Sequence, residues 1–253
     1  MSIGAILIGL LTGFISAFFG IGGSSIDTPL LRVFLHTPQY VALGSPLPTA
    51  LLTIMIALAI YWKQHLINYH ILKWSLVGGI PGIIFGSYLS GKFSGRSLML
   101  MSAVVLFCIG INFIYKKFHS HEINANITEH KPINASFVTV IAFIASTISG
   151  MLANGGGLLL IPAYVLIFKL KIKEAIATSL MTVLVMFIPA CIIHYHLGHI
   201  DLGISLAMSL GVIPMAYIGA KTNLKTKSNT IQLLFGIMLI IFSVYFFISQ
   251  LWG

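Results

Sequence analysis

The stretch TGFISAFFGIGGSSIDTPLL at residues 12–31 recurs in altered form as ASTISGMLANGGGLLLIPAY at residues 145–164. The two copies align without a gap at an offset of 133 residues, and the alignment continues to Gly86 and Gly219. It holds 17 identities in 75 pairs, and the six that are Gly or Pro indicate a duplication, because aliphatic residues coincide often by chance. Two copies of one apolar unit, each broken by glycines at the same place, are typical of membrane transporters with a site between their halves.

The composition indicates that the solvent of this chain is lipid. Of its 253 residues, 58% are hydrophobic and only 8% are charged, which is too much apolar surface for a soluble domain. Apolar stretches that approach or reach the roughly 20 helical residues of a membrane span run over Ile3–Gly20, Val41–Trp62, Trp74–Gly91, Leu98–Tyr115, Ala135–Ala153, Ala175–Tyr195, Leu202–Ala220 and Thr230–Leu251. Two shorter apolar segments, Ile26–Leu35 and Leu158–Phe168, follow the glycine breaks.

The sequence therefore predicts an all-α polytopic membrane protein. We expect two homologous halves, residues 1–115 and 135–253, with about four transmembrane helices each and a broken or re-entrant glycine-rich segment in each half. A polar linker at residues 116–134 joins them. Both cysteines, Cys108 and Cys191, lie inside apolar spans and are expected to be core residues, with no disulfide framework.

The net charge of +9 is carried by Lys and Arg in short loops, where they set membrane orientation. We expect no nucleic-acid partner, because no basic and aromatic surface is arranged for one. If Ile3–Leu35 crosses the membrane once, the basic residues divide nine against five and the repeats are parallel. If Ile3–Leu35 is a hairpin or re-entrant pair, they divide eleven against three and the halves are inverted. The second division agrees better with the positive-inside rule, and it predicts both termini outside and the linker in the cytoplasm.

The two glycine breaks are the candidate substrate site. Glycine runs at membrane depth are tolerated where the freed backbone lines a cavity or is buried in protein, and a helix that starts after such a run presents its N–H groups and positive dipole to an anion. The residues expected to bind a small anion here are Gly22, Gly23, Ser24, Ser25, Asn154, Gly155, Gly156 and Gly157. The alternative is that these glycines only allow close helix packing.

A second matched pair of segments carries hydroxyl groups near the start of a long apolar span. The side chains are Ser45 and Thr49 in the first copy and Thr178, Ser179 and Thr182 in the second. Two interpretations stay open at this point: the hydroxyls cap helices, or they line the same substrate cavity.

Asp27 is the one acidic residue embedded in an apolar stretch, and its repeat counterpart is Leu160. An ionisable residue at membrane depth is costly and is a functional candidate by default. Three roles are compatible with the sequence: Asp27 carries a coupling proton, it pairs with Arg32, or it caps the local N–H groups as a built-in anion.

The segment His194-Tyr195-His196-Leu197-Gly198-His199 contains side chains that bind metals. It lies at the end of a span, where His and Tyr also favour the membrane interface. A cation or metal permease that uses Asp27, His194, His196 and His199 is therefore the alternative from another class. A membrane scaffold without transport is a third possibility. No arrangement typical of an enzyme or of a cofactor site appears in the sequence.

Both copies resemble the TauE/SafE family of membrane permeases, also described as sulfite exporter-like. The resemblance rests on GFISAFFGIGGSSIDTPLL, STISGMLANGGGLLLIPA, EAIATSLMT and HIDLGISLAMSLGVIPMAYIGAK, and it covers nearly the whole chain apart from the linker. It implies transport of small sulfur-containing anions such as sulfite or organosulfonates, with Gly22, Gly23 and Gly155 to Gly157 at the translocation site. The chain departs from the family pattern at GGSS, where a third glycine is common, and at Asp27, where an apolar residue is usual.

The expectation from the sequence is thus a secondary transporter of a small anion in a bacterial inner membrane, working by alternating access between two repeats. Asp27 would couple transport to protons. The expected partners are the anion, protons and the lipid bilayer, and a homo-oligomer is compatible with the sequence.

Overall fold

The computed structural model describes residues 2–90, 95–119, 134–151, 157–196 and 198–251. These residues form helices joined by short loops, with no strand among them. The helices are α1 (Ser2–Phe19), α2 (Ser24–Leu35), α3 (Gln39–Gly44), α4 (Pro46–Trp62), α5 (Tyr69–Ser90), α6 (Gly95–His119), α7 (Ala135–Met151), α8 (Gly157–Pro162) with the π-helical turn η1 (Ala163–Ile167), α9 (Ile172–His196), α10 (Leu202–Lys225) and α11 (Ser228–Leu251).

The first two helices form a hairpin that enters and leaves at the same end of the bundle. α1 ends at Phe19, and α2 runs back until Leu35 lies against Gly4 near the start of α1. The segment Ile3–Leu35 is therefore a helical hairpin and not one long span. A single helix of that length would measure about 50 Å, well beyond the hydrocarbon thickness of a bilayer.

Helix pairs from opposite halves pack closely through glycines. α1 runs parallel to α10, with Gly9 against the backbone of Met208 and Gly219 against Phe14. α5 runs parallel to α7, with Gly78 against Thr139 and Gly86 against Thr147. Small residues let helix backbones approach in lipid, where packing takes the place of the hydrophobic driving force. The glycines of α1, α5 and α10 therefore serve helix packing, whereas the packing alternative raised for the two breaks concerns other glycines.

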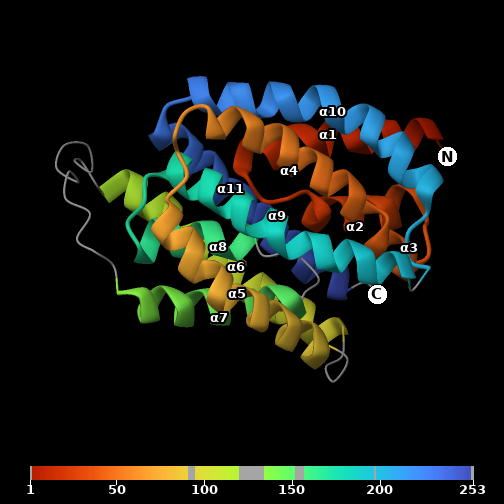
Figure 1. Ribbon diagram of the computed structural model, residues 1–253. Coiled ribbons are helices and arrows are strands. Elements are labelled where there is room, and N and C mark those ends of the chain that lie inside the picture. The colour runs from red at the N-terminus through yellow and green to blue at the C-terminus, as the bar shows by residue number, and fades with distance from the viewer. Residues whose placement is uncertain (1, 91–94, 120–133, 152–156, 197, 252–253) are drawn as a thin grey trace.

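The helix boundaries recur at the offset seen in the sequence. α1, α2, α5 and α6 begin at residues 2, 24, 69 and 95, and α7, α8, α10 and α11 begin at residues 135, 157, 202 and 228. α3 and α4 together correspond to α9, and Figure 1 shows α9 running between the α1–α4–α10 layer and the α5–α7 layer.

Corresponding helices of the two halves that contact each other run antiparallel. In the α6–α11 pair, Gly110 lies against Gly236, and the Ser243 hydroxyl donates to the carbonyl oxygen of Ala103 at 2.7 Å. In the second pair, Gly44 at the end of α3, directly before α4, lies against His199, beyond the end of α9. Antiparallel contact between matched helices is the geometry of a two-fold axis perpendicular to them.

Two helix boundaries differ from the expected segments. The span Val41–Trp62 is split at Ser45 into α3 and α4, because two prolines, Pro46 and Pro48, disfavour a continuous helix there. α6 continues to His119, so its last four residues fall within the segment expected as the linker. Residues 120–133 of the linker lie outside the described residues.

Two of the described helical segments, Leu202–Lys225 and Ser228–Tyr245, are long and apolar enough to cross a membrane by length and composition. Shorter apolar helices in the described residues include Ile3–Phe19, Pro46–Trp62 and Ala135–Gly150. The outer faces of the bundle are apolar too, as Leu206 (68% exposed) and Tyr88 (71% exposed) illustrate. Apolar faces of this extent are typical of contact with lipid or with a partner protein.

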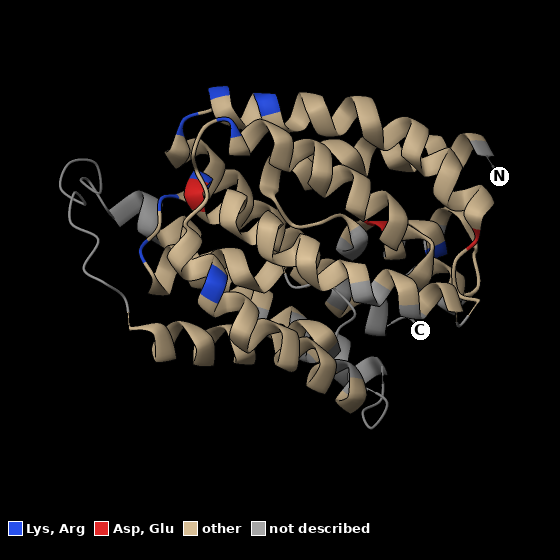
Figure 2. Ribbon diagram, in the orientation of Figure 1, with Lys and Arg blue, Asp and Glu red and all other residues tan. Residues whose placement is uncertain are grey.

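Basic residues gather at one end of the bundle. Figure 2 shows Lys and Arg concentrated where α9 begins and α10 ends, and both termini of the described chain lie toward the opposite end. Lys173 donates to the carbonyl oxygen of Leu224 at 2.7 Å, which joins the start of α9 to the end of α10.

Candidate functional site

The first glycine break is a true interruption of the helix. Gly20, Gly22 and Gly23 have φ angles of 74°, 85° and 85°, a left-handed region that residues with a Cβ rarely adopt. A Cβ at Gly22 would lie 3.2 Å from Val183 of α9 and 3.6 Å from Ile54 of α4. Since both neighbours lie near the middle of their helices, the break is at mid-depth in the bundle.

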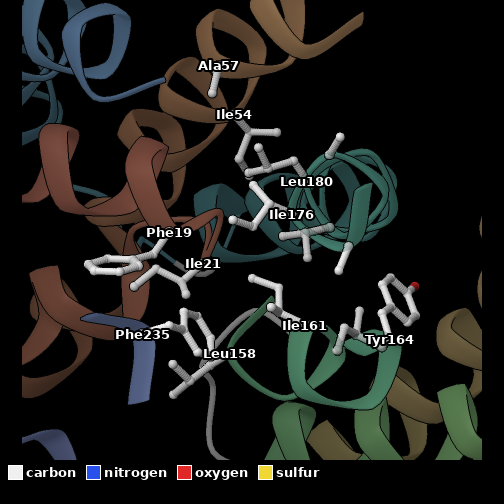
Figure 3. Close-up of a cluster of buried hydrophobic side chains, with 14 of the residues drawn as sticks. Phe19, Ile21, Ile54, Ala57, Leu158, Ile161, Tyr164, Ile176, Leu180 and Phe235 are labelled. Atoms are coloured by element: carbon white, nitrogen blue, oxygen red, sulfur yellow. The ribbon is translucent and has the colours of Figure 1, made fainter. Parts of the chain in front are cut away.

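The start of α8 meets this break directly. A Cβ at Gly157 would lie 2.8 Å from the carbonyl oxygen of Ile21 and 3.1 Å from that of Gly20. Figure 3 shows Ile21 facing Leu158 and Ile161 of α8, and all three are fully or almost fully buried. α7 and α8–η1 form a second hairpin, since the rings of Phe137 at the start of α7 and Phe168 after η1 lie 6.0 Å apart. The two hairpins therefore touch at mid-depth, and this contact is closed to solvent in the present conformation.

Side chains from distant helices satisfy the carbonyl groups at the end of α1. The Tyr61 hydroxyl donates to the carbonyl oxygen of Ala17 at 3.2 Å, and the Asn223 amide donates to that of Phe18 at 2.7 Å. Tyr61 and Asn223 are completely buried. The last turn of a helix has carbonyls without intrahelical partners, so these two residues hold the broken end of α1 in place.

A polar cluster lies at the start of α2. Gly23 is the N-cap of α2 and provides no side chain for capping, and a Cβ there would lie 3.3 Å from both the Asp27 carboxyl and the Ser16 hydroxyl. Asp27 is 1% exposed, its Oδ1 has no hydrogen-bond partner in the described residues, and its carboxyl is hydrogen-bonded to the Thr12 hydroxyl. Ser16 Oγ is likewise buried without a partner there. No ion pair of Asp27 with Arg32 is observed among the described residues, and Arg32 is exposed.

Ser45 and Thr178 lie at opposite ends of the bundle and not at the breaks. The backbone N–H of Asp201 donates to Ser45 Oγ at 2.9 Å, and that of Asn68 donates to Thr178 Oγ1 at 3.0 Å. Ser45 makes no side-chain cap for α4. Neither hydroxyl caps its own helix, and each instead accepts a hydrogen bond from the other half.

Thr49 and Thr182 lie one turn further along their helices. Thr49 donates to the carbonyl oxygen of Pro46 at 2.7 Å and Thr182 to that of Thr178 at 2.8 Å. The hydroxyl oxygens of Thr182 and Tyr164 are 3.2 Å apart. Ser179 is buried, and its hydroxyl has no partner in the described part of the chain.

The second break is described only from Gly157 onward. Asn154, Gly155 and Gly156 lie outside the described residues, and Ser24 and Ser25 are described only as the first backbone residues of α2. The structure thus brings together Gly22, Gly23, Asp27 and Gly157 in the middle of the bundle.

Two histidines of this segment, His194 and His199, lie against each other. Nδ1 of His194 and Nδ1 of His199 are 3.2 Å apart, and the described residues contain no group of three or more His, Cys, Asp or Glu side chains that could hold a metal ion. A cavity of about 230 Å³ between α6, α7 and α8–η1 is lined by apolar residues, including Ile141 and Leu159, and offers no polar group to an ion.

Sequence reasoning missed the residues that position the breaks. Nothing in the sequence marks Tyr61 or Asn223 as a residue of the site. Tyr61 ends an aliphatic run, and Asn223 stands in a polar segment rich in Lys and Thr. Ser16 was detectable, since it is identical to Ser149 in the duplication. Asn68 and Asp201 occupy the same position of the repeat, which is also visible in the sequence. Their hydrogen bonds with Thr178 and Ser45 do not follow from that correspondence.

The chain is similar to several curated proteins along nearly its whole length. Probable membrane transporter protein YunE of Bacillus subtilis is 26% identical, with 93% of each chain covered. Probable membrane transporter protein YjnA of the same organism is 24% identical over 95% of this chain and 98% of its own. A probable membrane transporter protein of Methanocaldococcus jannaschii is 26% identical over 90% of this chain and 89% of its own. No solved structure matches the chain significantly.

The family model described as sulfite exporter TauE/SafE matches residues 5–246. This match includes the contact between the first break and α8, and it covers every helix except the first three residues of α1 and the last five of α11. The relatives that match along nearly the whole chain are named as probable membrane transporters. The chain is therefore an integral membrane protein of the transporter type, and it belongs to the TauE/SafE sulfite exporter family.

Proposed function

We propose that this protein is a secondary transporter of a small anion, a sulfur oxyanion or organosulfonate such as sulfite, and that it works by alternating access between two inverted repeats. The observation that carries the proposal is the meeting of the two hairpins at mid-depth, where Gly157 of one lies against Ile21 of the other. Transporters built from inverted repeats bind their substrates at such an interface of discontinuous helices.

The inversion is supported by the direction of matched helices. α6 and α11 are antiparallel, as are α4 and α9. A two-fold axis that relates such antiparallel helices is perpendicular to them. If the helices cross a membrane, this axis lies in the membrane plane, and the two repeats have inverted topology. Because basic residues favour the cytoplasmic side, the Lys-rich end faces the cytoplasm in this proposal. Both termini are then outside, and the most direct setting is a bacterial cytoplasmic membrane.

The chemistry of the breaks suits an anion. α2 is a 12-residue helix that begins at the first break, and its N-cap, Gly23, has no side chain to cap the first turn. The positive end of the helix dipole at this point favours an anionic ligand. The hydroxyl of Ser16 lies at the same point and is a free donor among the described residues. In the full proposal, Ser24, Ser25, Asn154 and Gly155 to Gly157 contribute donors, and Thr49, Ser179 and Thr182 line the path.

Asp27 provides the coupling. Its carboxyl lies at the N-terminus of α2, where a negative charge competes with an anionic substrate for the same dipole. Protonation removes that competition, so the proton and the anion bind together. Because the repeat counterpart of Asp27 is Leu160, the duplication supplies one such group per chain, and the proposal expects one proton per cycle at this position.

The test is transport by purified protein in proteoliposomes. Gly22→Ala places a methyl group 3.2 Å from Val183 in a left-handed backbone conformation, and we expect it to abolish uptake of labelled sulfite. Gly198→Ala is the matched control, since Gly198 also has a positive φ of 70° but has nothing within 4 Å of an added Cβ. The same backbone strain without crowding should leave uptake intact. Equal uptake by both variants, or uptake of sulfite no faster than by empty liposomes in the unaltered protein, contradicts the proposal.

A further inference from the structure

Two hydrogen bonds between the halves form a matched pair. Ser45 and Thr178 occupy the same position of the repeat, and so do their partners Asp201 and Asn68. The bonds are almost equal in length, 2.9 Å and 3.0 Å. Each partner also caps the helix that follows it, since Asn68 Oδ1 accepts from Ile71 N and Asp201 Oδ1 accepts from Ile204 N, both at 3.0 Å.

The two bonds lie at opposite ends of the bundle. Asn68 lies between α4 and α5, at the Lys-rich end where α9 begins, and Thr178 is in the second turn of α9. Asp201 lies between α9 and α10, at the end where the chain termini lie, and Ser45 joins α3 to α4. The Ser45 bond therefore joins the start of α4 to the loop after α9, and the Thr178 bond joins the start of α9 to the loop after α4.

We propose that these bonds are two gates, one on each side of the breaks, and that Ser45 and Thr178 are positioning residues that decide which side opens. This inference rests on the proposed alternating access. Both acceptor side chains are fully buried, so the present conformation has both gates closed. Opening either end separates α4 or α9 from the opposite loop and exposes the broken bond to water.

The two gates differ in strength. At the termini end, the Ser205 hydroxyl lies 2.8 Å from the carbonyl oxygen of Ser45 and 2.9 Å from that of Asp201, so its proton is shared between the two halves. The repeat counterpart of Ser205 is Leu72, which has no hydroxyl to donate. Gly44 also lies against the backbone of His199 at this end. The termini end is thus the tighter gate, and the protein without substrate opens preferentially at the Lys-rich end.

Removing one acceptor shifts the equilibrium toward opening at that end. In the closed gate, Ser45→Ala leaves the N–H of Asp201 without its partner, whereas water satisfies this group in the open gate. The same reasoning applies to Thr178→Val and the N–H of Asn68. A single hydrogen bond of ordinary strength corresponds to about a fivefold change in the equilibrium between the two open states.

The experiment measures from which side of the membrane a water-soluble reagent reaches the first glycine break. Cys108 and Cys191 are replaced by alanine, and Ala50→Cys provides a reporter, because Ala50 is fully buried and its Cβ would lie 3.4 Å from a Cβ at Gly23. A membrane-impermeant thiol reagent is applied to right-side-out and to inside-out vesicles. Ser45→Ala should raise labelling from the termini side about fivefold, and Thr178→Val should raise it from the Lys-rich side by a similar factor. Ser205→Ala should shift labelling in the direction of Ser45→Ala by a smaller amount.

Thr222→Ala is the matched control, because this hydroxyl donates only within its own helix, to the carbonyl oxygen of Ile218 at 2.8 Å. It should leave both labelling rates unchanged. Shifts of Ser45→Ala and Thr178→Val in the same direction, or no difference from Thr222→Ala, overturn the gate inference. If Ser45→Ala does not fold, Ser205→Ala tests the same gate. Labelling requires no substrate, so opposite shifts in a protein that does not transport sulfite would retain the gates and reject the proposed substrate.

Discussion

Gly157, the first residue of α8, lies against the carbonyl groups of Gly20 and Ile21, which belong to the opposite half of the chain. The closest atoms are backbone atoms, at 2.8 Å to 3.1 Å from an added Cβ, so neighbouring side chains cannot relieve the crowding by changing rotamer. This contact joins the glycine break after α1 to the start of α8. Its consequences extend to transport, coupling and stability.

Gly157→Ala should slow transport, because the added methyl group crowds the backbone of Gly20 and Ile21. Overpacking against rigid backbone costs about 1–3 kcal/mol, and a tenfold loss in rate corresponds to about 1.4 kcal/mol. We expect at least a tenfold loss of sulfite uptake. Gly198→Ala is the control, since a Cβ there would meet no atom within 4 Å. Uptake by Gly157→Ala at the control rate would show that the hairpin tips do not move against each other.

Asp27→Asn should abolish proton-driven accumulation of sulfite and leave the exchange of internal for external sulfite intact. The amide keeps the size of the side chain but cannot release a proton, so an inward proton gradient should no longer drive uptake, while exchange of internal for external sulfite should continue. The unaltered protein should take up anion faster when the outer solution is acidic, because protonation removes the negative charge at the start of α2. The measurement is uptake with and without a pH gradient, followed by counterflow at equal pH.

A variant with the residue of the second half, Asp27→Leu, provides the comparison. It also abolishes titration and additionally removes the hydrogen bond with Thr12. If gradient-driven uptake survives in both Asp27→Asn and Asp27→Leu, Asp27 does not carry the coupling proton.

Tyr61→Phe and Asn223→Leu should each destabilise the protein. Both remove a donor from a carbonyl group at the buried end of α1, and an unsatisfied buried group costs about 1–3 kcal/mol. The larger effect is expected for Asn223→Leu, because its bond is shorter, 2.7 Å against 3.2 Å. Thermal unfolding in detergent measures the loss. An unchanged melting temperature in both variants would mean that water replaces these donors at the break.

Replacing His194, His196 and His199 together by glutamine should leave anion transport intact. These residues form a pair and an exposed ring and give no three-ligand site in the described part of the chain. Uptake of sulfite and of divalent metals by the triple variant separates the two classes of transporter. Loss of a metal flux that the unaltered protein supports would favour the cation permease.

The position of the first break and the return of α2 along α1 could be read from the chain itself. Gly22 and Gly23 interrupt an apolar stretch too long for one span and too short for two, and the distribution of Lys and Arg favours a chain that turns back at this point. The role of Ser45 and Thr178 could not be read in the same way. Their position at a helix start predicts a local cap, but their hydrogen bonds reach residues 156 and 110 positions away.

The sequence by itself determined the lipid environment, the duplication at an offset of 133 residues and the interruption at Gly20 to Gly23, because hydropathy, repeat spacing and glycine backbone freedom are local properties of the chain. Only the tertiary structure decided that the hairpin tips touch at Gly157 and Ile21, that Tyr61 and Asn223 hold the end of α1, and that Asp27 meets Ser16 and Thr12. These contacts depend on how helices from opposite halves pack, and residue types alone do not encode which partner satisfies a buried polar group.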